Sequence, residues 1–147
     1  MSNISKKTYQ SISHINQDLN HWTGGWTDWN LVLDTKGGPN WVGNNVDAPI
    51  IVNKTSGEYY KQPFFYALGH FSKFLSPDSH RIGVQIYDPT PSTALEVTAF
   101  TRPDNSTVVI VLNRNDEPIP LAIKDPVYGF TQNVIKANSM QSYIWFD

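Results

Sequence analysis

Residues 24–47 read GGWTDWNLVLDTKGGPNWVGNNVD and carry three of the chain's five tryptophans. Asp28 and several asparagines place carboxylate and amide groups among those rings. This combination is typical of a sugar site, because an aromatic ring packs on the apolar face of a sugar while polar side chains bind its hydroxyls. Tryptophan is also a common core residue with a hydrogen-bonded N–H group. From composition alone, the core interpretation is favoured for Trp26, Trp29 and Trp41.

On either side of this stretch, the first half of the chain predicts helices around a single strand. Apolar side chains at helical spacing predict a helix over residues 4–20. Residues 26–33 are apolar on both faces, which is typical of a strand buried in a parallel sheet covered by helices. A short hairpin is expected over 49–53 and 58–61, followed by a second helix that starts at Pro63 and ends at Ser76-Pro77. These elements are typical of an α/β domain, but the buried strand lacks the neighbouring strands of a parallel sheet.

From His80 onward the pattern changes to short strands separated by turns. Strands are expected over 81–87, 94–101, 107–113, 119–124, 130–136 and 140–146. The run STVVIVLNR, from Ser106 to Arg114, is apolar on both faces and predicts a central strand. Regular short strands favour an all-β antiparallel sandwich. We therefore expect residues 1–77 to form an α/β piece and residues 78–147 to form a β-sandwich domain.

Composition excludes several classes of protein. The net charge is −2 and only 16% of residues are charged, so the chain has no basic surface for nucleic acid. The chain has no cysteine, which excludes disulfides and thiolate metal sites. There is no apolar run of about 18 residues that would span a membrane. We expect neither a nucleic-acid partner nor a membrane span.

Three sequons bear on the cellular compartment. Asn3, Asn53 and Asn105 each begin an Asn-X-Ser/Thr tripeptide and are candidate glycosylation sites of a secretory route. The amino terminus lacks the apolar segment of a signal peptide. If the chain enters a secretory compartment, the signal is expected elsewhere, as in an amino-terminally truncated chain.

The carboxylates do not predict a complete glycosidase active site. Glycoside hydrolysis normally uses two carboxylates on either side of the scissile bond. The three glutamates, Glu58, Glu96 and Glu117, are expected in a hairpin, a sandwich strand and a turn. Asp28 lies within the predicted buried strand and has no visible partner. It is either a catalytic acid or, as we favour, a hydrogen-bonded residue that is structural or supports the side chains that touch the sugar.

The remaining polar residues indicate no cofactor. The four histidines show no metal-ligand spacing, so no metal site and no cofactor are expected. Asn40 and Asn44 lie in the loop around Trp41, and loops that follow barrel strands often carry ligand groups. Asparagine is equally suited to turns, so both interpretations stay open.

Three long blocks resemble one enzyme family. They are WTDWNLVLDTKGGPNWVGNNVDAPIIV, YKQPFFYALGHFSKFLSPDSHRIGV and VVIVLNRNDEPIPLAIKDPVYGF. They are similar, in order, to the carboxy-terminal part of the acid β-glucosidases, the lysosomal glucosylceramidases of glycoside hydrolase family 30. The resemblance runs from about Tyr9 to Trp145. It implies the last strand and flanking helices of a (β/α)8 barrel, followed by a β-sandwich.

The resemblance also implies which residues meet the substrate. Trp29 matches an aromatic residue that lines the glucose subsite, and Asn44 matches an asparagine near the sugar. Trp26 and Trp41 keep the core interpretation. Gly43 and Asn45 depart from the mammalian pattern, which leaves the lipid contacts of this loop undefined. The two family glutamates would precede residue 1, so the chain alone is expected to be inactive.

The function implied is that of a retaining β-glucosidase that hydrolyses glucosylceramide to glucose and ceramide in sphingolipid metabolism. Expected partners are the glycolipid substrate, a saposin-type activator protein and a membrane surface, and the expected location is the lysosome or secretory route. Two alternatives stay open. One is a non-catalytic β-sandwich module that binds a lipid or a protein, and the other is a piece of another family-30 β-glycanase.

Overall fold

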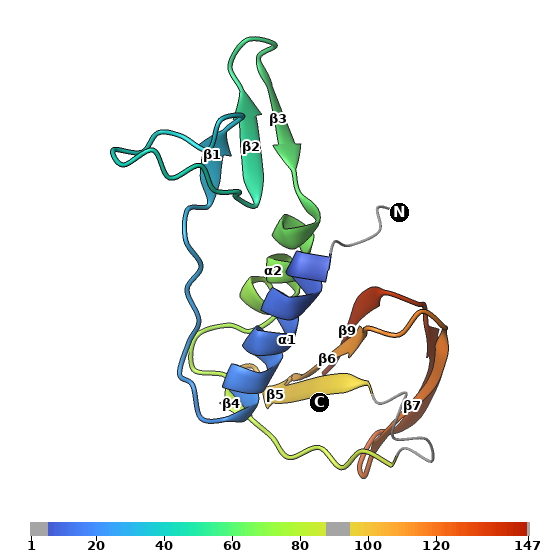
Figure 1. Cartoon of the computed structure of the whole chain (residues 1–147). Helices are drawn as coiled ribbons and strands as arrows, with labels where there is room; N and C mark the ends of the chain where they lie inside the picture. Colours follow the sequence, from blue (N-terminus) through green and yellow to red (C-terminus); the bar gives the residue numbers. More distant parts are fainter. Residues whose placement is uncertain (1–5, 88–94, 147) are drawn as a thin grey trace.

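The computed structural model describes residues 6–87 and 95–146. It places two helices between a protruding three-stranded sheet and a β-sandwich (Figure 1). The elements are α1 (Lys6–Asn20), β1 (Val32–Asp34), β2 (Ile50–Asn53), β3 (Glu58–Lys61), α2 (Pro63–Ser72), β4 (His80–Arg81), β5 (Glu96–Thr101), β6 (Thr107–Asn113), β7 (Ile119–Asp125), β8 (Gly129–Ile135) and β9 (Ser139–Trp145). Their sheets have the orders β1-β2-β3, β4-β5-β6-β9 and β7-β8.

Strand β6 lies at the centre of the larger sheet and pairs antiparallel with both β5 and β9. Val108, Ile110 and Leu112 point to the helices, whereas Val109 and Val111 belong to a second core shared with β7 and β8. The central strand predicted from the apolar run is confirmed. It is apolar on both faces because helices cover one face of the sheet and a second sheet covers the other.

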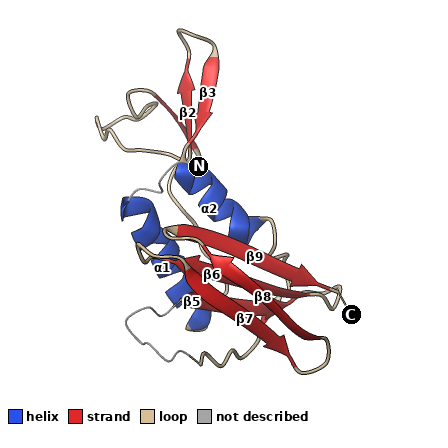
Figure 2. Cartoon of the chain, turned by 90° about the vertical axis from the view of Figure 1, so that its right-hand side faces the viewer, coloured by secondary structure: helices blue, strands red, loops and turns tan. Residues whose placement is uncertain are grey.

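Both helices pack on the same face of the four-stranded sheet (Figure 2). The predicted first helix is confirmed over Lys6–Asn20, and its Ile12 and Ile15 side chains are fully buried. They join Ala67 and Phe71 of α2 in one core with the helix-facing side chains of β6. The helices and the sandwich sheet therefore share a core rather than forming separate units.

Polar side chains join α1 to strand β5 by hydrogen bonds. Ser13 Oγ donates to Glu96 Oε1 (3.0 Å), and Arg114 Nη1 donates to the same carboxylate oxygen (2.8 Å). About two turns further on, Asn20 Nδ2 donates to the carbonyl of Val97 (3.0 Å). These bonds satisfy groups that would be costly to bury alone.

Helix α2 is tied to the last strand by a histidine. His70 Nδ1 lies 2.8 Å from Ser142 Oγ on β9. Burial lowers the pKa of His70, because desolvation disfavours the charged imidazolium. The neutral ring thus serves as a structural hydrogen-bonding partner between α2 and β9.

The hairpin prediction is confirmed, and the strand predicted before it is wrong in extent and burial. β2 and β3 pair in register from Ile50 with Lys61 to Asn53 with Glu58. Of residues 26–33, however, only the last two are in strand β1, and Leu33 is the one buried side chain there. Trp29 is 74% exposed.

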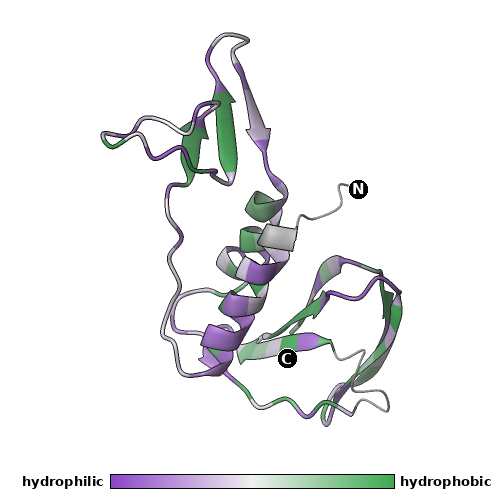
Figure 3. Cartoon of the chain, viewed as in Figure 1, coloured by the Kyte–Doolittle hydropathy of each residue, from purple (hydrophilic) through white to green (hydrophobic). Residues whose placement is uncertain are grey.

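The physical reason is a lack of cover. In Figure 3, β1 and β2 are apolar strands that lie beyond the helices, apart from the sandwich. β1 pairs in parallel with β2, and α1 and α2 pack on β6 and its neighbours instead. An apolar pattern predicts burial only when other elements are present to cover it.

Residues 81–87 are the second correction. Their apolar side chains alternate, yet β4 comprises only His80 and Arg81, which pair with β5. Ile86 is 54% exposed. Beyond Arg81, the Ile82 N–H group still donates to the Ala99 carbonyl of β5 (2.9 Å), but residues 83–87 have no partner strand among the described residues. The other strands agree with prediction to within two residues, although residue 94 lies outside the described residues.

Candidate functional site

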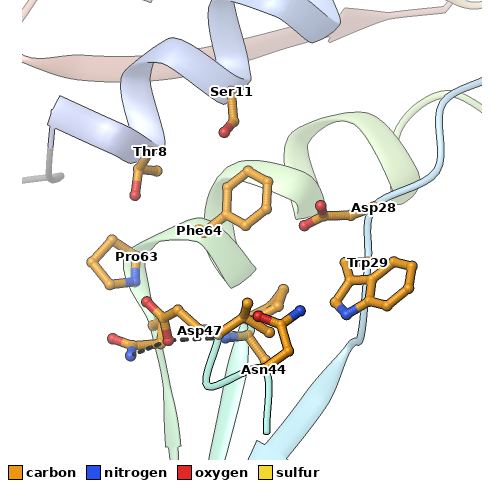
Figure 4. Close-up of a pocket in the computed structure, with 12 residues that line it drawn as sticks. Thr8, Ser11, Asp28, Trp29, Asn44, Asp47, Pro63 and Phe64 are labelled. Carbon is orange, nitrogen blue, oxygen red and sulfur yellow. Dashed lines mark hydrogen bonds between the residues drawn. The ribbon is translucent and has the colours of Figure 1, made fainter. Parts of the chain in front are cut away.

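A pocket of about 650 Å³ lies between the first turns of α1, the start of α2 and the segments on either side of β1 (Figure 4). Its lining comes from four separate segments: Thr8 and Ser11; Asp28 and Trp29; Asn44, Val46, Asp47, Ala48 and Pro49; and Gln62, Pro63 and Phe64. The volume is within the range of roughly 300–1,000 Å³ that is usual for small-molecule sites. The lining combines aromatic, amide and carboxylate groups.

Trp26 anchors the segment that carries Asp28 and Trp29. Its ring packs edge-on against Phe64 of α2, with centroids 6.5 Å apart and planes at 84°. Trp26 is partly buried at the edge of the helix–sheet core, as predicted for a core tryptophan. Three residues further on, Trp29 turns into the pocket with most of its ring uncovered. Its ring face is therefore available to a ligand.

Asp34 shapes the start of the long loop after β1. Its Oδ1 accepts hydrogen bonds from the backbone N–H groups of Lys36 (2.8 Å) and Gly38 (2.9 Å). These two bonds, Gly38 first, lower the pKa of Asp34, because they favour the carboxylate form. The carboxylate folds the chain back so that residues 40–47 return to the pocket.

The structure separates Asn40 from Asn44. Asn40 Nδ2 donates to the carbonyls of Gly37 and Asn44, both at 3.0 Å, and its Oδ1 accepts from the Asn44 N–H group (3.1 Å). Asn40 is thus a turn-forming residue. It holds the backbone of Asn44, whose side chain lines the pocket near Trp29 and Asp28 (Figure 4).

Gly37 permits the closest backbone approach in this loop. Its φ is +76°, and a Cβ added there would lie 2.8 Å from both the nitrogen and the carbonyl oxygen of Val46. Gly43 has a similar φ of +67°, but nothing lies within 4 Å of an added Cβ. Because residue 37 is a glycine, the backbone of Val46, which lines the pocket, can pass close to the turn that Gly37 forms.

We expect Gly37→Ala to destabilise the chain by about 2–4 kcal/mol, since it combines a left-handed φ with a backbone clash. Gly43→Ala is the matched control, and it carries only the left-handed penalty of roughly 1–2 kcal/mol. Urea unfolding followed by circular dichroism measures both. If both variants lost the same free energy of unfolding, the contact between residue 37 and the Val46 backbone would not limit the side chain at position 37.

Asp47 is a pocket residue that the sequence argument missed. Its Oδ1 accepts from the Ala48 N–H group (2.9 Å) and from Gln62 Nε2 (3.2 Å), which ties the loop to the start of α2. The only signal was its position at the end of the Trp-rich stretch. It brings a second carboxylate into the pocket, across from Asp28 (Figure 4).

Trp41 contradicts its prediction. It was expected in the core but is 103% exposed, at a loop position that does not line the pocket. The pattern of tryptophans could not reveal this, because the turn built by Asn40 directs the ring outward. The loop, rather than the residue type, decides its exposure.

The other predicted sites lie away from the pocket. Asn53 ends β2 and Asn105 lies in the turn between β5 and β6, whereas Asn3 is outside the described residues. Over residues 6–87 and 95–146, no group of three His, Asp or Glu side chains is arranged to hold a metal. Neither helix in this part of the chain is long and apolar enough to cross a membrane.

Comparison with known families decides the classification. The model of the glycosyl hydrolase family 30 TIM-barrel domain matches residues 3–75, and that of the family 30 β-sandwich domain matches residues 78–143. The chain belongs to glycoside hydrolase family 30. Its first part is a fragment of the family-30 TIM barrel, and its second part is the family-30 sandwich.

Relatives place the chain among the glucosylceramidase-like members of family 30. It is 51% identical over 135 residues to the lysosomal acid glucosylceramidase of Mus musculus, covering 92% of this chain and 25% of that protein. It is 47% identical over 115 residues to a putative glucosylceramidase of Caenorhabditis elegans, covering 78% of this chain and 22% of that protein. The chain thus spans about a quarter of the length of the curated relatives it matches.

Solved structures agree on the fold. SrfJ from Salmonella typhimurium superposes with a TM-score of 0.80 at 23% identity, covering all of this chain and 33% of that one. The endo-β1,6-glucanase BT3312 superposes with a TM-score of 0.76 at 21% identity, covering 90% of this chain and 31% of that one. At these identities the likeness concerns the arrangement of helices and strands alone.

Proposed function

We propose that this chain is the carboxy-terminal part of a glucosylceramidase-like retaining β-glucosidase and supplies one wall of its glucose site. The observation that carries the proposal is the pocket, which unites Trp29, Asn44 and Asp28 from two separated segments. The exposed ring of Trp29 offers a flat apolar face to a sugar. The amide of Asn44 offers both a donor and acceptors for sugar hydroxyls.

In this proposal the catalytic acid/base and nucleophile come from barrel strands outside residues 1–147. The positions of the three glutamates support it. Glu96 is paired with Arg114 at 2.8 Å, Glu58 is exposed in the hairpin, and Glu117 is exposed in a turn. None of them lines the pocket. Asp28 takes a supporting role beside the sugar rather than a catalytic one.

The proposed substrate is a glycolipid of the glucosylceramide type. The 51% identity to a mouse protein named lysosomal acid glucosylceramidase supports this class. The same relationship supports a lysosomal or secretory route for the intact enzyme. A membrane surface and a saposin-type activator are the partners proposed for it. A different family-30 β-glycan is the alternative substrate, and loops from the rest of a barrel would select between them.

The division of the chain follows from the same proposal. Residues 1–77 are assigned to the barrel and residues 78–147 to the sandwich, and the two family matches, 3–75 and 78–143, support this boundary. The alternative of an independent sandwich module is disfavoured. Val108, Ile110 and Leu112 of the sandwich share a core with α1 and α2, so a sandwich without the helices would expose that face.

The experiment is a chimaera in which this chain replaces the matching 135 residues of the mouse enzyme. We expect the chimaera to hydrolyse glucosylceramide and a fluorogenic β-glucoside, and the chain alone to show no turnover. Turnover by the chain alone that is lost in Asp28→Asn or Asp47→Asn would place catalysis in this chain instead. A folded chimaera that cleaves another β-glycan but not glucosylceramide would reject the proposed substrate.

A further inference from the structure

Two described sequons differ sharply in how the fold presents them. Asn53-Lys54-Thr55 forms the end of β2 and the turn of the β2–β3 hairpin, where Lys54 and Thr55 are exposed. Asn105-Ser106-Thr107 begins in the β5–β6 turn and runs into the central strand β6. A glycosylating enzyme must bind the whole tripeptide, so the surroundings of all three residues matter.

The Asn53 tripeptide is held open by its own turn. Asn53 Oδ1 accepts from the N–H groups of Thr55 (3.1 Å) and Ser56 (3.4 Å), and the Asn53 carbonyl accepts from Gly57 N–H (3.0 Å). These bonds use only the carbonyl oxygens of Asn53. Its amide nitrogen and the Thr55 hydroxyl make no hydrogen bond to the described part of the chain.

The Asn105 tripeptide is locked into the sandwich. Ser106 is fully buried, and its hydroxyl donates to Asp104 Oδ1 at 2.5 Å. Thr107 pairs on one side with Thr101 of β5 and on the other with Trp145 of β9. Asn105 itself is exposed in the turn, but to present Ser106 and Thr107 to an enzyme the first residue of β6 would have to detach from both β5 and β9.

From this contrast we propose that Asn53 is an N-glycan acceptor of the folded chain and that Asn105 is not an acceptor once β6 has formed. The donor is a lipid-linked diphospho-oligosaccharide. The Asn53 amide nitrogen forms a bond to the anomeric carbon of the first sugar, and the amide loses one proton. The bond from that carbon to the diphosphate oxygen breaks, and the lipid diphosphate leaves with the electron pair.

The hairpin also determines where such a glycan lies. Asn53 is opposite Glu58, and Tyr60 is two residues further along the same face of β3. Diagonal neighbours of this kind are about 7–8 Å apart, so the first sugar reaches the half-exposed ring of Tyr60. All four residues of β3 are exposed, so this face of the hairpin has room for a glycan.

The glycan would leave the sugar pocket accessible. Pro49 lines the pocket at the opposite end of β2 from Asn53. Four residues of extended chain separate these ends by about 13 Å. The modification therefore adds to the proposed glucose site without occupying it, and in a cell it depends on the proposed secretory route.

The test uses the full folded chain made in bacteria, a purified oligosaccharyltransferase and a lipid-linked oligosaccharide, with glycopeptides quantified by mass spectrometry. Synthetic peptides 50–58 and 102–110 serve as unfolded references, and both are expected to be modified. In the folded chain we expect modification of Asn53, with Asn105 slower than in its peptide by on the order of 10²-fold or more, because its strand must first open.

Thr55→Ala removes the acceptor tripeptide but keeps the turn-forming Asn53, and it should abolish modification at that site. Equal modification of Asn53 and Asn105 in the folded chain, or no modification of Asn53 while its peptide reacts, would overturn the proposal. Since this reaction needs no secretory entry, its outcome is independent of the proposed glucosidase function.

A second arm expresses the chain in insect cells behind a cleaved signal sequence, with a control Asn-X-Thr tripeptide in a flexible carboxy-terminal tag. Occupancy of Asn53 together with the control tripeptide is the expected result. Occupancy of the control tripeptide without Asn53 would contradict the proposal in cells.

Discussion

Trp29→Ala in the chimaeric mouse enzyme should lower kcat/KM for a β-glucoside by about 10- to 100-fold. The ring is 74% exposed and lines the pocket, so its removal costs the chain little packing but deprives the sugar of an apolar face. Loss of a contact worth roughly 1.5–3 kcal/mol corresponds to this range. Steady-state hydrolysis of a fluorogenic β-glucoside measures the effect.

Trp22→Ala is the matched control for this prediction. Trp22 is 91% exposed, carries the same side chain and lies outside the pocket, with the Arg81 guanidinium 5.8 Å from its ring centroid. Its replacement should leave kcat/KM within twofold of the parent chimaera. Equal losses in the two variants, or no loss in Trp29→Ala, would reject the assignment of Trp29 to the glucose site.

Ile110→Ala should destabilise the chain by about 2–5 kcal/mol, the usual cost of deleting a fully buried aliphatic side chain. Ile110 is 0% exposed at the centre of β6, where it packs in the core shared by α1, α2 and the sandwich sheet. Because that core joins both parts of the chain, helix and strand signals should be lost together. Urea unfolding followed by circular dichroism and tryptophan fluorescence tests both points.

Ile86→Ala makes the same chemical change at a position that is 54% exposed. Its effect should stay within about 0.5 kcal/mol. Two separate unfolding transitions, with only the sandwich affected by Ile110→Ala, would show that the helices and the sandwich are independent units. A similar loss in both variants would contradict the burial on which the prediction rests.

The elements predicted correctly are those whose signals are local. Helix α1 follows from the spacing of Ile12 and Ile15, and the β2–β3 hairpin follows from two short strands around Ser56 and Gly57. β6 is recognisable because a run of apolar β-branched residues on both faces fits only a strand covered twice. In each case the spacing of the apolar residues matches the repeat of the helix or strand that they form. The local sequence is therefore enough to predict the element.

The strand predicted over 26–33 and the buried Trp41 were wrong because burial is not a local property. The same apolar pattern is buried or exposed according to what lies next to it, and the described chain covers only Leu33 of β1. Likewise, the alternation continues to residue 87, but within the described chain the bonds of this segment to β5 end at Ile82, whose N–H group donates to the Ala99 carbonyl. The pattern predicts which residues can be buried, and the neighbours decide which are.

For the candidate site, the residues were chosen by sequence and their meeting was decided by the fold. The stretch 24–47 and its resemblance to family 30 singled out Asp28, Trp29 and Asn44. The resemblance selected Asn44 rather than Asn40, and the tertiary structure supplies the physical reason: Asn40 builds the turn and Asn44 lines the pocket. Asp47 was identified only from the fold. The turn at Asp34 and the close approach of Gly37 to Val46 bring residues 44–47 to the same pocket as Asp28 and Trp29. The spacing of residues along the sequence does not predict this arrangement.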